Sequence, residues 1–234
     1  MAEPGTFLPD NRIGEMLVSA RSFAEYRRMF SLTGNDLRAT ILDCPGGAAS
    51  FTAEVGAHGG RAVACDPQYV LPVAELAARA RADLARGYQY HQGNPGEYVW
   101  TFFRDPDHYL AVRSASIERF TEHFSASPEN YVAASLPALP FPDGSFDLAL
   151  CSHLLFSYAD RLGHDFHLAS ILELTRVARE VRIHPLVPMG FDSNPELPGL
   201  IAELGHRNVR AEVLPVDYEF QRGGHSMLCC RLNG

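Results

Sequence analysis

Two stretches of the chain hold carboxylates and glycines at a spacing that suits nucleotide chemistry. Asp43 follows an apolar run that predicts a buried strand over 39–42, and the small-residue loop after it contains Gly46 and Gly47. Such a loop lets backbone amides approach a ligand before a helix begins. Asp66 ends the next predicted strand, near the roughly 20-residue spacing at which an acid accepts both hydroxyls of a ribose. The pattern indicates the first half of an adenosine-cofactor site.

The chemistry of this loop favours one class of cofactor. A dinucleotide places its pyrophosphate on a helix N-terminus after a Gly-x-Gly-x-x-Gly turn, which residues 43–51 do not contain. Asp43 would repel a phosphate, but it suits the positively charged amino group and sulfonium of S-adenosylmethionine. At this point the chain resembles the class I S-adenosylmethionine-dependent methyltransferases. Pro45 and Ala49 stand where the first motif of that family usually has glycine, and Gly47 is kept between them.

A second stretch resembles the same family. Residues 139–150 read Leu-Pro-Phe-Pro-Asp-Gly-Ser-Phe-Asp-Leu-Ala-Leu, similar to the family's third and fourth strands with the turn between them. The Pro-Asp-Gly at 142–144 is turn chemistry, and the apolar run at 146–150 is typical of a parallel strand covered on both faces. The resemblance implies that Ser135 hydrogen-bonds the adenine, where the family often has Asp, and that Leu136 contacts the base.

The resemblance runs from about residue 26 to the C-terminus, apart from an insertion, and implies both a fold and a cofactor site. The expected fold is α/β: a doubly wound, mostly parallel seven-stranded sheet with a C-terminal antiparallel hairpin, the Rossmann-like methyltransferase fold. We expect one domain over 1–234 with S-adenosylmethionine as its cofactor. The resemblance implies that Tyr26 or Arg27 closes over the methionine end of the cofactor, and a core role for Tyr26 is an equal alternative. The expected cofactor-binding residues are Tyr26, Asp43, Pro45, Gly46, Gly47, Asp66, Pro67, Ser135, Leu136 and Cys151.

Hydrophobic periodicity predicts the remaining elements. Residues 1–12 are expected to be a loose tail. Helices are predicted over 13–30, 71–86, 168–180 and 195–204, with Gly87 ending the second of them. A fifth strand is predicted over 181–187. Residues 209–219 and 226–232 are predicted to pair as the terminal hairpin through the Gly-rich turn between them.

The insertion over 88–130 is longer than one crossover helix requires, and it is rich in aromatic and charged residues. Insertions of this length in compact domains are usually lids or binding elements. One interpretation is a cap of two helices, 97–103 and 106–124, that covers the substrate at the carboxyl edge of the sheet. The other is an extra packed helical pair whose aromatic residues are core. Both interpretations stay open from the sequence.

His153, just past the predicted fourth strand, is the candidate general base, because a neutral imidazole accepts a proton from a hydroxyl or an amine. The favoured alternative is a structural histidine that caps the next segment or hydrogen-bonds the cofactor carboxylate. Methyl transfer also proceeds by positioning alone when the acceptor carries no proton. Tyr158, Asp160, His164 and His167 follow on the next segment, where most are expected to be solvated. We expect no metal, because His164 and His167 have no obvious third ligand.

Composition limits the class of protein. The chain has 234 residues, 46% of them hydrophobic, which is enough for one large core. A formal net charge of −8 argues against nucleic acid as a partner. The expected partner is a small-molecule methyl acceptor. The five cysteines have neither metal-finger nor redox spacing, so small buried thiols are expected. No signal pattern and no apolar run long enough for a bilayer is present, so no membrane partner and a cytoplasmic location are expected.

The sequence therefore predicts an S-adenosylmethionine-dependent methyltransferase, with the acceptor and the oligomeric state left open. Two alternatives come from other classes of protein. A non-catalytic protein that binds S-adenosylmethionine would keep the cofactor residues without an acceptor pocket. A nicotinamide-dependent oxidoreductase is disfavoured by Asp43 and by the missing third glycine.

Overall fold

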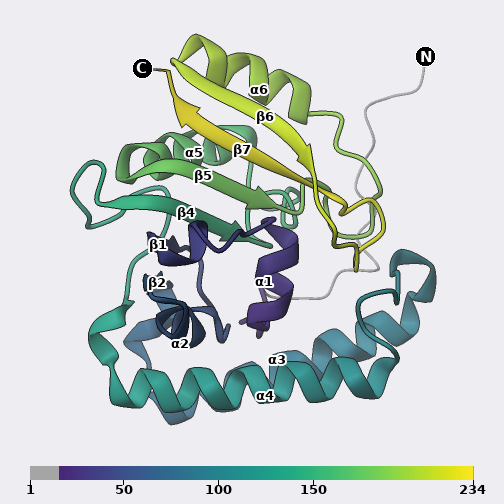
Figure 1. Cartoon of the computed structure of the whole chain (residues 1–234). Coiled ribbons are helices and arrows are strands. Elements are labelled where there is room, and N and C mark those ends of the chain that lie inside the picture. Colours follow the sequence, from purple (N-terminus) through teal and green to yellow (C-terminus); the bar gives the residue numbers. More distant parts are fainter. Residues whose placement is uncertain (1–15, 234) are drawn as a thin grey trace.

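The computed structural model describes residues 16–233, which form a seven-stranded sheet with helices on both faces (Figure 1). The strand order is β3-β2-β1-β4-β5-β7-β6. The first five of these strands run parallel, and β7 lies antiparallel to both β5 and β6. The predicted fold is confirmed, including the terminal hairpin. The strands are β1 Thr40–Asp43, β2 Arg61–Cys65, β3 Tyr131–Val132, β4 Phe146–Ser152, β5 Ala178–His184, β6 Val209–Pro215 and β7 Ser226–Leu232.

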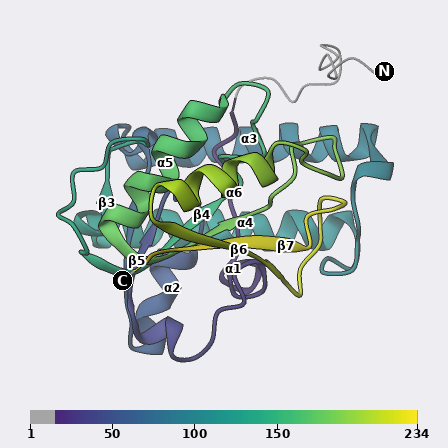
Figure 2. The ribbon, with the colours of Figure 1, turned by 90° about the horizontal axis from the view of Figure 1, so that it is seen from above.

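The helices divide between the two faces of the sheet. They are α1 Phe23–Met29, α2 Phe51–Val55, α3 Val73–Gly93, α4 Pro106–Ala126, α5 His164–Val177 and α6 Leu197–His206. Figure 2 shows α5 and α6 lying together over the β4, β5 and β6 region, which they contact. The long helices α3 and α4 pack side by side beyond the opposite face, next to α2 (Figure 1).

Alternating side chains along β1 and β4 explain why these strands are apolar throughout. Leu42 and Ala149 belong to the core cluster that includes residues of α5 and α6. Ile41 and Leu148, one position earlier, belong to the cluster that includes residues of α1 and α2. Because each face of the sheet is covered by helices, neither set of side chains meets water. The sheet is therefore a rigid support for the loops at its carboxyl edge.

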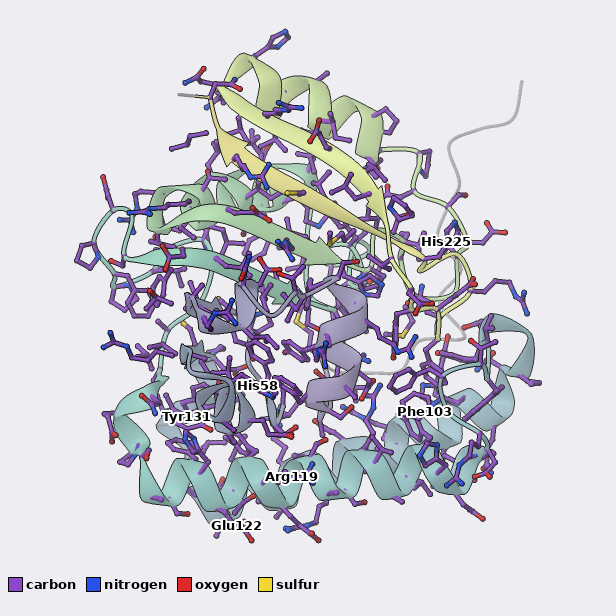
Figure 3. All side chains as sticks on the ribbon, in the orientation of Figure 1. His58, Phe103, Arg119, Glu122, Tyr131 and His225 are labelled. Carbon is purple, nitrogen blue, oxygen red and sulfur yellow. The ribbon has the colours of Figure 1, made fainter. Side chains whose placement is uncertain are left out.

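Helix α4 has one buried and one exposed face. Ile117 and Phe120 pack in a cluster with Ala80 of α3. Arg119 and Glu122, labelled in Figure 3, are exposed. Asp105 caps the helix by accepting a hydrogen bond from the backbone N–H of His108 at 2.7 Å, and a proline follows it at the first helical position. This confirms the predicted helix over 106–124.

Three predicted boundaries were wrong. Helix α1 begins at Phe23 rather than residue 13, because Ser22 and Glu25 form a reciprocal capping box there. Residues 13–15 and the predicted tail lie outside the described residues. Helix α3 passes Gly87 and ends at Gly93. Strand β5 begins at Ala178, directly after α5, where a helical extension to residue 180 was predicted.

The predicted helix over 97–103 was also wrong. A short 3₁₀ turn, Pro95–Glu97, is followed by irregular backbone up to α4. Val99 donates its backbone N–H to the carbonyl of Phe220 at 2.7 Å, and Arg222 donates to Glu97 at 2.7 Å. The segment therefore pairs with the connection between β6 and β7 instead of coiling. Within residues 16–233, no helix has the length and apolar character needed to cross a membrane.

Candidate functional site

The carboxyl ends of β1, β2 and β4 enclose a cavity of ≈ 280 Å³, here called the strand-end cavity. It lies where parallel α/β sheets bind their ligands. The structure brings seven of the predicted site residues into its wall, from the loops that follow the four strands β1, β2, β3 and β4. These seven are Pro45, Gly47, Asp66, Pro67, Ser135, Leu136 and His153.

Asp66 is fixed by two backbone donors. Its Oδ1 accepts from the N–H of Gln68 at 2.9 Å, and its Oδ2 accepts from the N–H of Gly47 at 3.1 Å. The residue is 8% exposed, and burial raises the pKa of its carboxyl above the ordinary value. Because a carboxylate has about four acceptor positions, two remain for a ligand in the cavity. The same side chain thus ties the loop after β1 to the loop after β2.

Tyr26 and Asp43 need a correction, because neither lines the strand-end cavity. The Tyr26 hydroxyl donates to Asp43 Oδ1 at 2.9 Å, and each residue is 1% exposed. The Tyr26 ring stacks on Phe51 at 4.7 Å between centroids. Burial raises the pKa of the Asp43 carboxyl well above its ordinary value. Tyr26 is a core residue that holds Asp43 behind the loop, not a cover over the cofactor.

Gly46 and Cys151 also lie behind the cavity wall. A Cβ on Gly46 would stand 2.5 Å from the Tyr69 hydroxyl oxygen and 2.8 Å from the Ala64 Cβ, so glycine lets the loop pack on β2. Cys151 is fully buried in the core cluster under α5. Its neighbour Ser152 lines the cavity in its place. Both predicted cofactor contacts are therefore corrected to packing roles.

An extended segment over residues 16–22, here called the strap, crosses the loop after β1. The carbonyl of Ser19 accepts from the N–H of Ala48 at 2.9 Å, and that of Arg21 accepts from Ser50 at 3.0 Å. Gly47 has a φ of +52°, and a Cβ there would stand 2.7 Å from the Ser19 carbonyl oxygen. The glycine is thus required by the strap. Sequence reasoning missed the strap, since its apolar spacing resembles that of a helix.

A second cavity of ≈ 70 Å³, here called the aromatic cavity, adjoins the first. Five residues line both cavities, and these are Leu17, Val18, Ser19, His153 and Tyr158. The rest of its wall comes from the strap, α3, the segment 98–113, the segment after β4, and the connections around β5 and β7. Its aromatic and charged members are Arg21, Asp83, His91, Tyr98, Tyr109, Arg113 and Phe220. Of these, sequence reasoning had singled out only members of the 88–130 insertion.

His153 stands at the junction of the two cavities. Its backbone N–H donates to the carbonyl of His184 at 2.7 Å, and its Nδ1 is 2.9 Å from the hydroxyl oxygen of Ser152. Burial, together with the nearby charge of Arg21, holds the pKa of His153 well below its usual range. The imidazole is therefore neutral at pH 7, which is the form that accepts a proton.

The segment after His153 contributes one further wall residue from the predicted set. Tyr158 accepts at its hydroxyl from the backbone N–H of Leu17 at 3.0 Å, which anchors the strap. His164 instead pairs with Glu203 at 2.9 Å, and His167 contacts the carbonyl of Leu155 at 2.9 Å. Neither histidine nor Asp160 lines either cavity. Among residues 16–233, no three histidine, cysteine or acidic side chains gather as a metal site.

Residues 108–180 match the model of a family described as a methyltransferase domain. The matched segment carries Ser135, Leu136 and His153 of the cavity wall and runs into β5 of a sheet with the expected strand order. The match agrees with the family that the sequence resembles and with the fold that this resemblance predicts.

The chain is similar to other proteins along most of its length. It is 28% identical over 218 residues to an uncharacterised protein of Methanocaldococcus jannaschii, covering 93% of this chain and 96% of that protein. A Burkholderia thailandensis 1,6-didemethyltoxoflavin-N1-methyltransferase structure is 16% identical, with a TM-score of 0.47 over 90% of this chain and 79% of that one. A putative RNA methyltransferase from Pyrococcus horikoshii is 8% identical, with a TM-score of 0.46 over 89% and 84%.

Proposed function

We propose that the protein is an S-adenosylmethionine-dependent methyltransferase, which holds its cofactor in the strand-end cavity and methylates a small molecule held in the aromatic cavity. The supporting observation is that the two cavities adjoin and share five wall residues. Displacement at a methyl group requires the nucleophile and the leaving group on opposite sides, so the two compartments must meet. His153 is among the shared residues, at the place where the reacting atoms would meet.

The residues of the strand-end cavity fit the cofactor. The spare acceptor positions of Asp66 suit the two ribose hydroxyls. Ser135 is exposed on the wall and supplies a hydroxyl for the adenine edge, while buried Leu136 and the ring of Pro67 supply apolar surface for its faces. The loop at Gly47 leads to the shared wall, where the methionine end belongs. Asp43 lies behind this loop, where its carboxyl accepts from the Tyr26 hydroxyl and holds the loop in place.

The chemistry at the junction follows from His153. Bound S-adenosylmethionine supplies an electrophilic methyl group on a sulfonium. The neutral imidazole of His153 accepts the proton of an acceptor hydroxyl or amine as that atom becomes the nucleophile. Arg21 and burial keep the imidazole neutral until then. An acceptor that carries no proton would use the same compartment without a base.

The 88–130 insertion supplies the acceptor side of a single domain. His91, Tyr98, Tyr109 and Arg113 all lie in the wall of the aromatic cavity. The remainder of α4 packs on α3 as core through residues such as Phe120. The two interpretations of the insertion therefore apply to different parts of it. One end bounds the acceptor and the rest supports that end.

A small acceptor suits this compartment better than nucleic acid. The aromatic cavity is only ≈ 70 Å³ and is lined by buried side chains. A nucleic-acid substrate needs a basic surface that neutralises several phosphates, whereas the chain carries a net charge of −8.

Methyl-labelled S-adenosylmethionine tests the proposal. The protein is incubated with the metabolite, RNA and protein fractions of a cell extract, and label is counted in each. We expect transfer to the metabolite fraction alone, together with calorimetric binding of S-adenosylhomocysteine and none of nicotinamide dinucleotide. Transfer to RNA or protein would contradict the small-molecule acceptor. Absence of S-adenosylhomocysteine binding would contradict the cofactor site.

A further inference from the structure

Resting on the proposed function, we propose that the methyl acceptor is a small aromatic carboxylate. Its carboxylate would pair with Arg21 and Arg113, and its ring would lie among the aromatic side chains of the aromatic cavity. The two arginines approach each other from the strap and from α4, and both line this cavity but not the strand-end cavity.

The two arginines are buried with too little negative charge beside them. Their side chains are 10% and 6% exposed. Both pair with one carboxylate oxygen of Glu25, Arg113 through Nη2 at 2.7 Å and Arg21 through Nη1 at 3.4 Å. Two positive charges therefore face one negative charge in a place that excludes water. Burying an uncompensated charge is costly, so a further anion would stabilise the pair.

Glu25 has little capacity left to satisfy them. Its Oε1 also accepts from the Tyr218 hydroxyl at 2.9 Å. Its Oε2 accepts from the backbone N–H of Ser22 at 2.9 Å and from the Ser22 hydroxyl at 3.1 Å. Among residues 16–233, the Nε of Arg21 and the Nε of Arg113 have no hydrogen-bond partner. A carboxylate is the group whose geometry matches the donors of guanidinium side chains.

The one acid among the residues lining the aromatic cavity, Asp83, does not supply the missing charge. Its Oδ2 accepts from the backbone N–H of Val18 at 2.8 Å, and its Oδ1 accepts from Arg86 at 3.0 Å. The Nε of Arg79 lies 4.0 Å from the Oδ2 of Asp83. Asp83 thus belongs to its own arginine pair and holds the strap. The excess of positive charge stays at Arg21 and Arg113.

The rest of the wall is largely aromatic. Tyr109 and Phe220 stack at 5.3 Å with an interplanar angle of 18°, and Tyr98 packs on Phe220 at 5.0 Å. Burial lowers the pKa of His91 to about 3, so this ring is neutral and adds no charge. Aromatic walls of this kind favour aromatic ligands through stacked and edge-on contacts. Within the described residues, the Ser157 hydroxyl also has no partner and is available to a ring substituent.

The methionine end of the cofactor also carries a carboxylate, so the experiment separates the two sources. Benzoate and neutral benzamide are titrated into the wild-type protein with and without S-adenosylhomocysteine. Trp100 is the single tryptophan of the chain, and its ring centroid lies 5.2 Å from that of Phe220 and 6.1 Å from that of Tyr109. Its fluorescence therefore reports on this wall. We expect benzoate to bind at least tenfold more tightly than benzamide.

Variants of the two arginines then test whether their charges bind the carboxylate of benzoate. Arg113→Gln and Arg21→Gln should each lose at least tenfold in benzoate affinity and keep S-adenosylhomocysteine affinity within twofold. Arg119→Gln is the matched control, because Arg119 lies on the exposed face of α4, away from Phe103, which packs on Phe220 (Figure 3). The control should bind benzoate as the wild type does.

Three results would overturn the proposal. The first is equal binding of benzoate and benzamide by the wild type, and the second is binding of neither compound. The third is a tenfold loss of S-adenosylhomocysteine affinity in either arginine variant, which would mean that the two arginines bind the carboxylate of the cofactor. The wild-type comparison decides the matter even if a variant fails to fold. Failure of the wild type to bind S-adenosylhomocysteine would instead contradict the proposed function.

Discussion

The two cavities that meet at His153 differ in what forms their walls. The strand-end cavity is shaped mainly by backbone, with a glycine at positive φ, two prolines and one acid held by backbone amides. The aromatic cavity is shaped by long side chains, with stacked rings and two buried arginines. Backbone features of a fold suit a ligand that a whole family shares. Side chains suit a particular acceptor, because substitutions can change them without changing the sheet.

The largest effect that separates the two cavities is expected at Gly47. Gly47→Val places a branched side chain at φ +52° and 2.7 Å from the Ser19 carbonyl oxygen, so the strap or the loop must move. S-adenosylhomocysteine binding should weaken more than about 100-fold, measured by calorimetry. Gly163→Val is the control, because that glycine has a negative φ and open space around it. Normal binding by a folded Gly47→Val protein would place the cofactor elsewhere.

At the junction, His153→Gln should lower turnover by on the order of 100-fold if the acceptor carries a proton, because general bases contribute at least that much. S-adenosylhomocysteine affinity should stay within a factor of two. Label transfer to the metabolite fraction measures the rate, and His164→Gln, outside both cavities, is the control. An unchanged rate at every pH would make His153 a structural residue only.

Asp66→Ala should weaken S-adenosylhomocysteine binding by about 2 kcal/mol, or about 30-fold, as expected for lost charge-assisted hydrogen bonds. Binding of benzoate to the aromatic cavity should change little, because Asp66 does not line it. Asp165→Ala, an exposed acid at the start of α5, serves as the control. Equal losses for both ligands would mean that the substitution disturbs the whole edge of the sheet.

A smaller effect is expected from pH. Burial raises the pKa of Asp66, and hydroxyl donors from a ribose would favour its ionised form. Binding should therefore be strongest above this raised pKa, weaken as the pH falls through it, and release protons in that range. Calorimetry from pH 7 downward checks this. In Asp66→Asn the same pH series should be nearly flat, and a persisting slope would assign the titration to another group such as Asp43.

The sequence predicts the wall residues of the strand-end cavity better than those of the aromatic cavity, because the two walls are assembled differently. The strand-end cavity takes much of its wall from short continuous runs that follow strand ends, such as 65–68 and 134–136, so local patterns pointed to Asp66 and Ser135 of this wall. The aromatic cavity joins distant segments that only the fold brings together. Leu17 and Ser19 have the spacing of one face of a helix, but their backbone groups bond elsewhere. The N–H of Leu17 donates to the Tyr158 hydroxyl, and the carbonyl of Ser19 accepts from the N–H of Ala48. Those tertiary hydrogen bonds, which no local pattern encodes, override the helical periodicity.

Strand register likewise explains two of the predicted cofactor residues that lie behind the wall. Asp43 and Cys151 stand at strand ends, where the alternation of side chains turns them into the core. Cys151 lies in the core cluster under α5, while its neighbour Ser152 lines the cavity. Tyr26 is instead buried from helix α1, and Gly46 packs closely against β2. The sequence placed the loops correctly. Which side chain of each pair faces the cavity depended on strand register within the assembled sheet.

A crystal structure of the protein with S-adenosylhomocysteine and benzoate tests the central claim most directly. We expect the ribose hydroxyls within hydrogen-bond distance of Asp66, the adenine beside Leu136, and the sulfur at the shared wall facing His153. Benzoate should lie beyond that wall with its carboxylate at Arg21 and Arg113. A nucleoside bound away from Asp66, or a homocysteine sulfur that points away from the aromatic cavity, would contradict the arrangement of two adjoining compartments.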